Sequence, residues 1–141
     1  MKFRWAALML ACAGMWAQDP GLTPEDLNKR LQAGERPHLY HVGFGVLYRN
    51  RHIAHSEFAG PGSKPEGLEA LKKAVAGFKK DEPIVIYCGC CPWDKCPNMR
   101  PAYRTLQALG FTRIQVVSIP TSLAKDWMDK GYPTEAGSAA R

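Results

Sequence analysis

The stretch PIVIYCGCCPWDKC, residues 83–96, joins a short apolar run to a loop that contains four of the chain's five cysteines. Residues 83–87 are apolar and partly β-branched, which is typical of a buried strand. Cys88 follows directly, so its thiol is predicted at a strand end, in a loop that leads to a helix. A cysteine in that place can act as an exposed nucleophile if its surroundings are electropositive. The stretch predicts thiol chemistry and leaves open whether the sulfurs transfer sulfur, carry electrons, bind a metal or stiffen the loop.

Strand and helix patterns alternate on both sides of this stretch. In chain order we expect a helix over 23–34, a strand over 38–42, a loop over 43–50, a helix over 65–78, the strand before Cys88, a helix over 101–109, a strand over 113–117 and a helix over 123–130. Such alternation implies parallel pairing and right-handed crossovers. The prediction is an α/β domain of three layers, with a central, mostly parallel sheet flanked by helices. Ligands of such sheets bind beyond the carboxyl ends of the strands, where Cys88 is expected.

The composition is that of a soluble globular protein of one domain. The chain has 141 residues, of which 45% are hydrophobic and 23% charged. The net charge is +6, a mild positive field that attracts small anions. The basic residues are scattered, and neither a recognition helix nor a zinc-finger spacing is evident in the sequence. We therefore expect a small anionic substrate and no nucleic acid.

The first 17 residues have the layout of a secretory signal peptide. Lys2 and Arg4 precede a short apolar run, and small residues follow up to Ala17. The apolar run is too short to cross a bilayer as a permanent helix. We expect cleavage after Ala17, which would lower the net charge to +4 and leave residues 18–141 as the mature domain. The prediction is an exported protein, periplasmic or extracytoplasmic, with no transmembrane segment after cleavage.

Three alternatives for this N-terminal segment stay open. Cleavage after Ala13 is the second choice of site. Lipid attachment at Cys12 is another, since Leu10-Ala11-Cys12 partly resembles a lipoprotein signal. The third alternative is a buried amphipathic helix, which the lack of acidic residues before Asp19 disfavours.

Five segments resemble, in order and spacing, the landmarks of single-domain rhodaneses. They are His38-Leu39-Tyr40-His41-Val42, Arg51-His52-Ile53-Ala54-His55, Ile84-Val85-Ile86-Tyr87-Cys88, Ala108-Leu109-Gly110-Phe111, and Trp127 with Gly131-Tyr132-Pro133. The resemblance covers about residues 22–134. It implies the rhodanese-like fold, a sulfurtransferase activity without a cofactor, and Cys88 as the nucleophile.

The sequence also departs from the rhodanese pattern. His41 stands in place of the family's aspartate, and Gly43 in place of the arginine that follows it. The active-site loop is longer than the usual six residues, and Asn98-Met99-Arg100-Pro101 replaces its usual closing sequence. The loop also carries Cys90, Cys91 and Cys96, which are three thiols beyond the one that the resemblance requires.

Sulfur transfer requires a thiolate that accepts a sulfane sulfur, becomes a persulfide and passes the sulfur on. Cys88 is our first choice for this thiolate, followed by Cys91 and then Cys96. Inward-pointing backbone N–H groups and a helix N-terminus would stabilise it. We assign Arg100 to the catalytic group because it can orient an oxyanionic donor. The expected partners are a small anionic sulfur donor and a thiol or protein acceptor.

Other residues of the loop are assigned to substrate binding or to structure. Gly89, Trp93 and Lys95 form the predicted substrate-binding loop, in which Lys95 adds positive charge and Trp93 is expected to pack on the protein. Outside the loop, His52 is expected to bridge loops, and Trp127 to lie in the core. For His41 and His55 two interpretations stay open: a place at the mouth of the pocket, or a purely structural role through hydrogen bonds, which is more common for a lone histidine at a strand end.

Two other classes of function fit the loop. Cys88 and Cys91 have the Cys-x-x-Cys spacing of thiol–disulfide oxidoreductases, and Cys91 or Cys96 can resolve a persulfide on Cys88. A Cys90–Cys96 or Cys91–Cys96 disulfide would stiffen the loop. Four thiolates can also bind zinc or copper(I), but adjacent cysteines are awkward ligands for one small ion, so no metal is predicted.

Overall fold

A computed structural model describes residues 21–137 of the chain. The predicted signal peptide, with Cys12, lies outside the described residues. Within residues 21–137, none of the helices is both long enough and apolar enough to cross a membrane.

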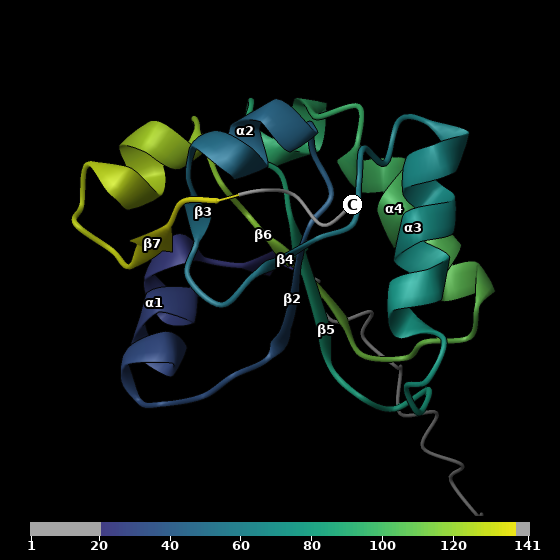
Figure 1. Cartoon of the computed structure of the whole chain (residues 1–141). Helices are drawn as coiled ribbons and strands as arrows, with labels where there is room; N and C mark the ends of the chain where they lie inside the picture. Colours follow the sequence, from purple (N-terminus) through teal and green to yellow (C-terminus); the bar gives the residue numbers. More distant parts are fainter. Residues whose placement is uncertain (1–20, 138–141) are drawn as a thin grey trace, which may run out of the picture.

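The main sheet has five parallel strands in the order β1-β6-β5-β2-β4 (Figure 1). They are β1 (Gly21–Leu22), β2 (His38–His41), β4 (Glu57–Phe58), β5 (Ile84–Tyr87) and β6 (Ile114–Val117). In the register, Ile84 pairs with His38 on one side and with Ile114 on the other. Because β5 is central and covered on both faces, all four of its residues are buried, which explains its continuous apolar run. The predicted α/β class and parallel sheet are confirmed.

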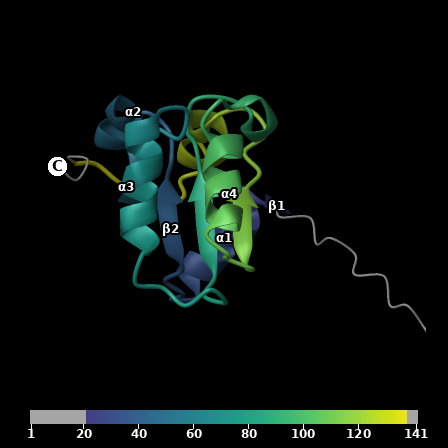
Figure 2. The same cartoon turned by 90° about the vertical axis from the view of Figure 1, so that its right-hand side faces the viewer.

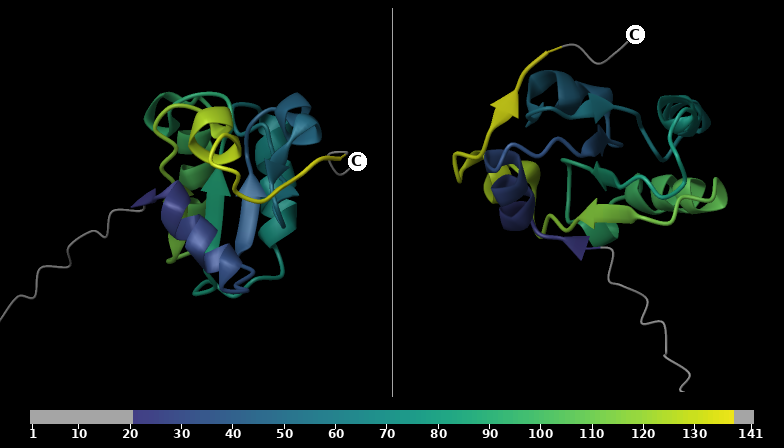
Figure 3. Two further views of the ribbon diagram at one scale, coloured as in Figure 1. Left: turned by 90° about the vertical axis from the view of Figure 1, so that its left-hand side faces the viewer. Right: turned by 90° about the horizontal axis from the view of Figure 1, so that it is seen from below.

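Helices cover both faces of the sheet and complete the three predicted layers. The helices α3 (Pro65–Val75) and α4 (Met99–Ala108) lie side by side on one face (Figure 2). The helix α1 (Pro24–Gln32) and the short π-helical segment η2 (Ala124–Met128) lie on the other face (Figure 3, left). Thr23 caps α1 as predicted, because its hydroxyl accepts a hydrogen bond from the Asp26 N–H at 3.1 Å.

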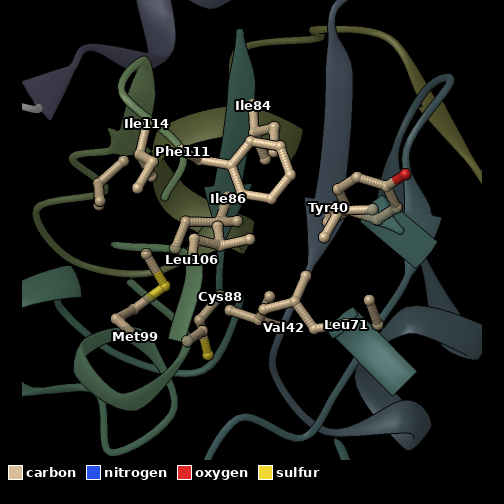
Figure 4. Close-up of a cluster of buried hydrophobic side chains, with 14 of the residues drawn as sticks. Tyr40, Val42, Leu71, Ile84, Ile86, Cys88, Met99, Leu106, Phe111 and Ile114 are labelled. Atoms are coloured by element: carbon tan, nitrogen blue, oxygen red, sulfur yellow. The ribbon is translucent and has the colours of Figure 1, made fainter. Parts of the chain in front are cut away.

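The alternation of side chains along β5 divides the interior into two cores. Ile84 and Ile86 pack with residues of α3 and α4 (Figure 4). Val85 and Tyr87 pack with residues of α1 and with the fully buried Trp127 of η2. The core position predicted for Trp127 is confirmed.

Several short elements differ from the sequence-based expectation. Residues 43–50, predicted as a loop, contain the helix α2 (Gly45–Asn50), which begins after Phe44 without a side-chain cap and is too short for a periodic pattern to reveal. A second, two-stranded sheet pairs β3 (His52–Ile53) with β7 (Thr134–Glu135) in antiparallel fashion. These strands, like β1 and β4, have two residues each, so alternation could not indicate them. Helix α4 begins at Met99, two residues before the predicted start.

His52 has the bridging role that the sequence predicts. Its Nδ1 hydrogen-bonds the carbonyl oxygen of Tyr48 at 2.8 Å, and its ring stacks on the Tyr48 ring at 3.7 Å between centroids. Its Nε2 lies 3.6 Å from a carboxylate oxygen of Glu135. His52 thereby joins α2 to the small sheet.

The buried hydroxyl of Tyr87 ties the segment around β3 to the end of the central strand. It accepts a hydrogen bond from the Ile53 N–H at 3.0 Å and lies 2.7 Å from the Ser56 hydroxyl. The Ser56 hydroxyl in turn donates to the Ile53 carbonyl at 2.7 Å. Burial raises the pKa of Tyr87, so the phenol stays neutral.

We predict that Tyr87→Phe destabilises the protein by about 1–3 kcal/mol, because the buried Ile53 N–H loses its acceptor. Urea unfolding would measure this loss. Tyr132→Phe is the matched control, since Tyr132 is only half-buried and packs on Trp127 through its ring. Equal stability of the two variants would contradict the role given to the Tyr87 hydroxyl.

Candidate active site

Cys88 lies directly after β5 and continues the alternation of that strand. Its side chain joins Ile84 and Ile86 in the core that faces α3 and α4, as Figure 4 shows. It is only 3% exposed. The structure therefore places Cys88 at the predicted strand end, but below the surface and not in the exposed position that the sequence suggested. The physical reason is the period of two along a strand, which directs residues 84, 86 and 88 to the same face.

The four cysteines of the loop bring their sulfurs together as free thiols. The Cys90 sulfur is central, at 3.4 Å from Cys88, 2.9 Å from Cys91 and 3.9 Å from Cys96. These separations exceed the length of a disulfide bond, about 2.05 Å. The predicted Cys90–Cys96 and Cys91–Cys96 disulfides are thus not formed in this structure. Cys90 is exposed and Cys91 half-buried, whereas Cys96 is as buried as Cys88.

Backbone hydrogen bonds hold the loop against the segment that follows β6. The Trp93 N–H donates to the Ile119 carbonyl at 3.0 Å, and the Leu123 N–H donates to the Gly89 carbonyl at 3.4 Å. A single turn of 3-10 helix, η1 (Trp93–Lys95), then returns the chain towards Cys96. The Trp93 side chain packs against the core, as predicted. The position of Cys96 near Cys88 follows from this folded-back path.

Asn98 is a residue of the site that the sequence analysis did not single out. It is fully buried, and its amide Nδ2 lies 3.8 Å from the sulfurs of both Cys88 and Cys96. Its Oδ1 accepts a hydrogen bond from the Ser63 N–H at 3.0 Å, which fixes the orientation of the amide. Asn98 occupies the N-cap position of α4 but makes no capping hydrogen bond there. An asparagine directly before this helix was the available signal, and sequence alone reads it as a cap.

The proton distribution in the cluster is uneven. The interaction with the Cys88 thiol, helped by the Asn98 backbone N–H, lowers the pKa of Cys96 to about 5. The same interaction with Cys96, together with burial, raises the pKa of Cys88. Burial and the neighbouring Cys90 raise the pKa of Cys91 to about 12. The directions of these shifts favour the negative charge on Cys96 and the proton on Cys88.

A cavity of about 580 Å³ lies between the loop and α4. It brings together four residues of the predicted site, namely Trp93, Lys95, Cys96 and Arg100. Cys88 and Gly89 do not line it. The loop therefore presents to Cys96 a pocket that contains an aromatic side chain and two basic side chains, with one acidic side chain, Asp94, beside them.

His41 lies beside Cys88 in the interior, which agrees with the structural role and not with a place at the mouth of a pocket. It is fully buried, and its Nδ1 accepts a hydrogen bond from the Gly43 N–H at 3.2 Å. Burial lowers the pKa of His41 to about 4, so the ring is neutral at pH 7. Its Nε2 has no hydrogen-bond partner within residues 21–137.

Gly43 has no side chain to separate His41 from Cys88. A Cβ at this position would come within 2.8 Å of the Cys88 sulfur and 2.9 Å of the His41 Cε1. His55 lies elsewhere, exposed, with its Nδ1 3.8 Å from a Glu135 carboxylate oxygen.

No protein-family model matches the sequence, and no curated protein matches it. Solved structures do resemble the fold at low identity. The rhodanese-like domain of a protein from Anabaena sp. superposes with a TM-score of 0.60 and 20% identity, covering 83% of this chain and 79% of that one. A thiosulfate sulfurtransferase from Pseudomonas aeruginosa gives 0.62 and 16%, with 86% of this chain but 21% of its own length covered. The polysulfide-sulfur transferase homodimer from Wolinella succinogenes gives 0.59 and 20%, covering 82% and 77%.

These likenesses confirm the fold that the sequence resemblance predicted. The chain has a rhodanese-like fold, with the cysteine loop following the central strand. At identities of 20% or less, these similarities establish the fold alone. The chemistry of the site depends on this chain's own residues.

We predict that Asn98→Asp slows alkylation of the cluster by iodoacetamide at pH 7 by about tenfold or more. The aspartate keeps the acceptor for Ser63 but turns a negative oxygen towards two sulfurs, which raises the thiol pKa values, and one unit corresponds to a factor of ten. Mass spectrometry after timed alkylation would measure the rate at each cysteine. Asn50→Asp, the same change at an exposed position, serves as the control. An unchanged rate in Asn98→Asp would show that the amide does not influence the thiols.

Proposed function

We propose that this protein is an exported sulfurtransferase that carries a sulfane sulfur as a persulfide on Cys88. The observation that carries the proposal is the position of Cys88, at the carboxyl end of the central strand of a rhodanese-like fold and at the start of a loop leading to a helix. Ligands of parallel α/β sheets bind at that edge. The names of two structural neighbours, a thiosulfate sulfurtransferase and a polysulfide-sulfur transferase, support thiosulfate or polysulfide as the class of donor.

A neighbour of Cys88 provides the proton acceptor that this reaction requires. The Cys88 proton passes to the Cys96 sulfur, which lies within 4.8 Å. The Cys88 thiolate then attacks the sulfane sulfur, so that a new S–S bond forms while the donor's own S–S bond breaks. The leaving sulfite, or shortened polysulfide, takes the electron pair of that bond. An acceptor thiolate later attacks the outer sulfur of the persulfide and releases Cys88 as a thiolate.

The cationic side of the loop suits an anionic donor. Lys95 and Arg100 place two basic side chains in the lining of the cavity that reaches Cys96, where Asp94 is the one acidic side chain. Arg100 can hold a sulfonate-like oxyanion through parallel N–H donors. Trp93 supplies an apolar wall to the same cavity.

Thiol–disulfide exchange is the second candidate, and one specific distance favours it. The sulfurs of Cys88 and Cys90 are 3.4 Å apart, so these two are placed to form a disulfide, in addition to the Cys88 and Cys91 pair that the sequence spacing suggests. In that reaction two thiols lose two hydrogens to a partner's disulfide, which is reduced to a dithiol.

Intact mass spectrometry distinguishes the two functions. After incubation with thiosulfate or a polysulfide and removal of the donor, we expect the protein to gain one sulfur atom, which dithiothreitol removes. Cys88→Ser should not gain it, whereas Cys91→Ser, a cysteine of the same loop, should. A loss of two hydrogens without a gain of sulfur would favour disulfide exchange. Sulfur uptake by Cys88→Ser but not by Cys96→Ser would move the nucleophile to Cys96.

Export is a separate part of the proposal and has its own test. Expression of the full chain in a Gram-negative host should place the protein in the periplasm. Its intact mass should equal that of a chain that begins at Gln18. The mass of a lipid-modified chain that begins at Cys12 would show that the protein is exported as a lipid-anchored protein and not as a soluble one. A cytoplasmic protein that retains residues 1–17 would contradict export altogether.

A further inference from the structure

We propose that Cys88, Cys90 and Cys96 form a binding site for one copper(I) ion. Their sulfurs all lie within 4.8 Å of one another, and two of the three cysteines are buried. This proposal goes beyond sulfur transfer and does not depend on it, because metal binding is measured without any sulfur donor.

The spacing of the sulfurs fits one ion. Thiolates bind first-row d10 ions at about 2.3 Å, so two sulfurs on the same ion are separated by about 3.8–4.0 Å in tetrahedral or trigonal geometry. The observed separations from Cys90 are 3.4 Å to Cys88 and 3.9 Å to Cys96. The third separation, from Cys88 to Cys96, is within 4.8 Å, so an ion that binds all three sulfurs requires shifts of less than about one ångström.

The structure also separates the ligands from the fourth cysteine. The Cys91 sulfur is 2.9 Å from that of Cys90, which is too short for two ligands of one ion. Cys91 does not belong to the group whose sulfurs mutually lie within 4.8 Å. The objection raised by adjacent cysteines thus disappears, because only one of the adjacent pair is a ligand.

The surroundings complete the site. The Asn98 amide directs its N–H donors towards the sulfurs of Cys88 and Cys96, at 3.8 Å each, and so offsets part of the thiolate charge. Cys88 and Cys96 belong to a hydrophobic core, which keeps water from the inner side of the ion. Cys90 is exposed and gives the ion a route of entry and exit. Donors of this kind outside the first ligands orient them and commonly change metal affinity by about 10–100-fold.

Three thiolates select copper(I) over zinc. Soft sulfur ligands suit both ions, but structural zinc sites are closed by four ligands. Among the histidine, cysteine and carboxylate groups of residues 21–137, the close group contains these three sulfurs alone. Copper(I) has a filled d shell and accepts two or three thiolates without a fourth ligand.

The test is an anaerobic titration of the reduced protein with copper(I) held by bicinchoninate, whose loss of colour reports transfer to the protein. We expect one tight equivalent for the wild type and for Cys91→Ser, and loss of the tight site in Cys90→Ser. Cys90 is exposed, so its substitution should leave the fold intact, which circular dichroism can verify. Asn98→Ala should retain the stoichiometry with an affinity lowered by about 10–100-fold.

X-ray absorption of the copper-loaded protein gives an independent measurement, and three sulfur neighbours are expected. Equal binding by Cys90→Ser and Cys91→Ser, or no transfer from bicinchoninate, would overturn the site. One zinc(II) held more tightly than copper(I) would overturn the choice of ion. Sulfur uptake by the metal-free protein is measured separately, so failure of either proposal leaves the other distinguishable.

Discussion

Successive side chains of β5 enter two different cores, and this alternation fixes where the first loop cysteine lies. Ile84 and Ile86 contact the layer formed by α3 and α4, while Val85 and Tyr87 contact the layer of α1 and η2. A shift of one residue in register would exchange the two sets and place the Tyr87 hydroxyl away from Ile53 and Ser56. The hydrogen bonds of Tyr87 therefore reinforce the same register that sends Cys88 inward.

The inward position of Cys88 makes the rest of the loop necessary. A thiolate in an apolar core is costly unless donors or charges stabilise it. The loop supplies partners by folding back along residues 119–123 and returning Cys96 and Asn98 to the end of β5. The buried amide then donates to two sulfurs from an orientation that Ser63 fixes from a third segment. A negative charge on a buried sulfur is thereby stabilised by the amide of Asn98, which lies 10 residues further along the chain than Cys88.

The fold was predictable from sequence because its main elements carry strong local patterns. The buried strand at 84–87 and the helix that Thr23 caps each follow from a few neighbouring residues. For the site, the sequence predicted only which cysteines belong to the loop. Which sulfurs meet depends on contacts such as the one from the Trp93 N–H to the Ile119 carbonyl, and no local pattern encodes a contact of that range. His41 illustrates the same limit, since a histidine at a strand end reads as exposed until α2 and β4 are seen to cover it.

The two chemistries proposed for the cluster use the same sulfur atom, that of Cys88. Donation of electron density to an ion makes the Cys88 sulfur a weaker nucleophile, so metal binding and persulfide formation compete at this residue. The ion and the sulfur donor reach the cluster at different residues, however. The ion enters at exposed Cys90, whereas the cationic cavity opens beside Cys96. An ion bound at Cys90 therefore affects a donor in the cavity beside Cys96, because both reach the shared Cys88 sulfur and the three sulfurs lie within 4.8 Å of one another. The additional cysteines that distinguish this loop from the six-residue rhodanese loop are the groups that create this competition.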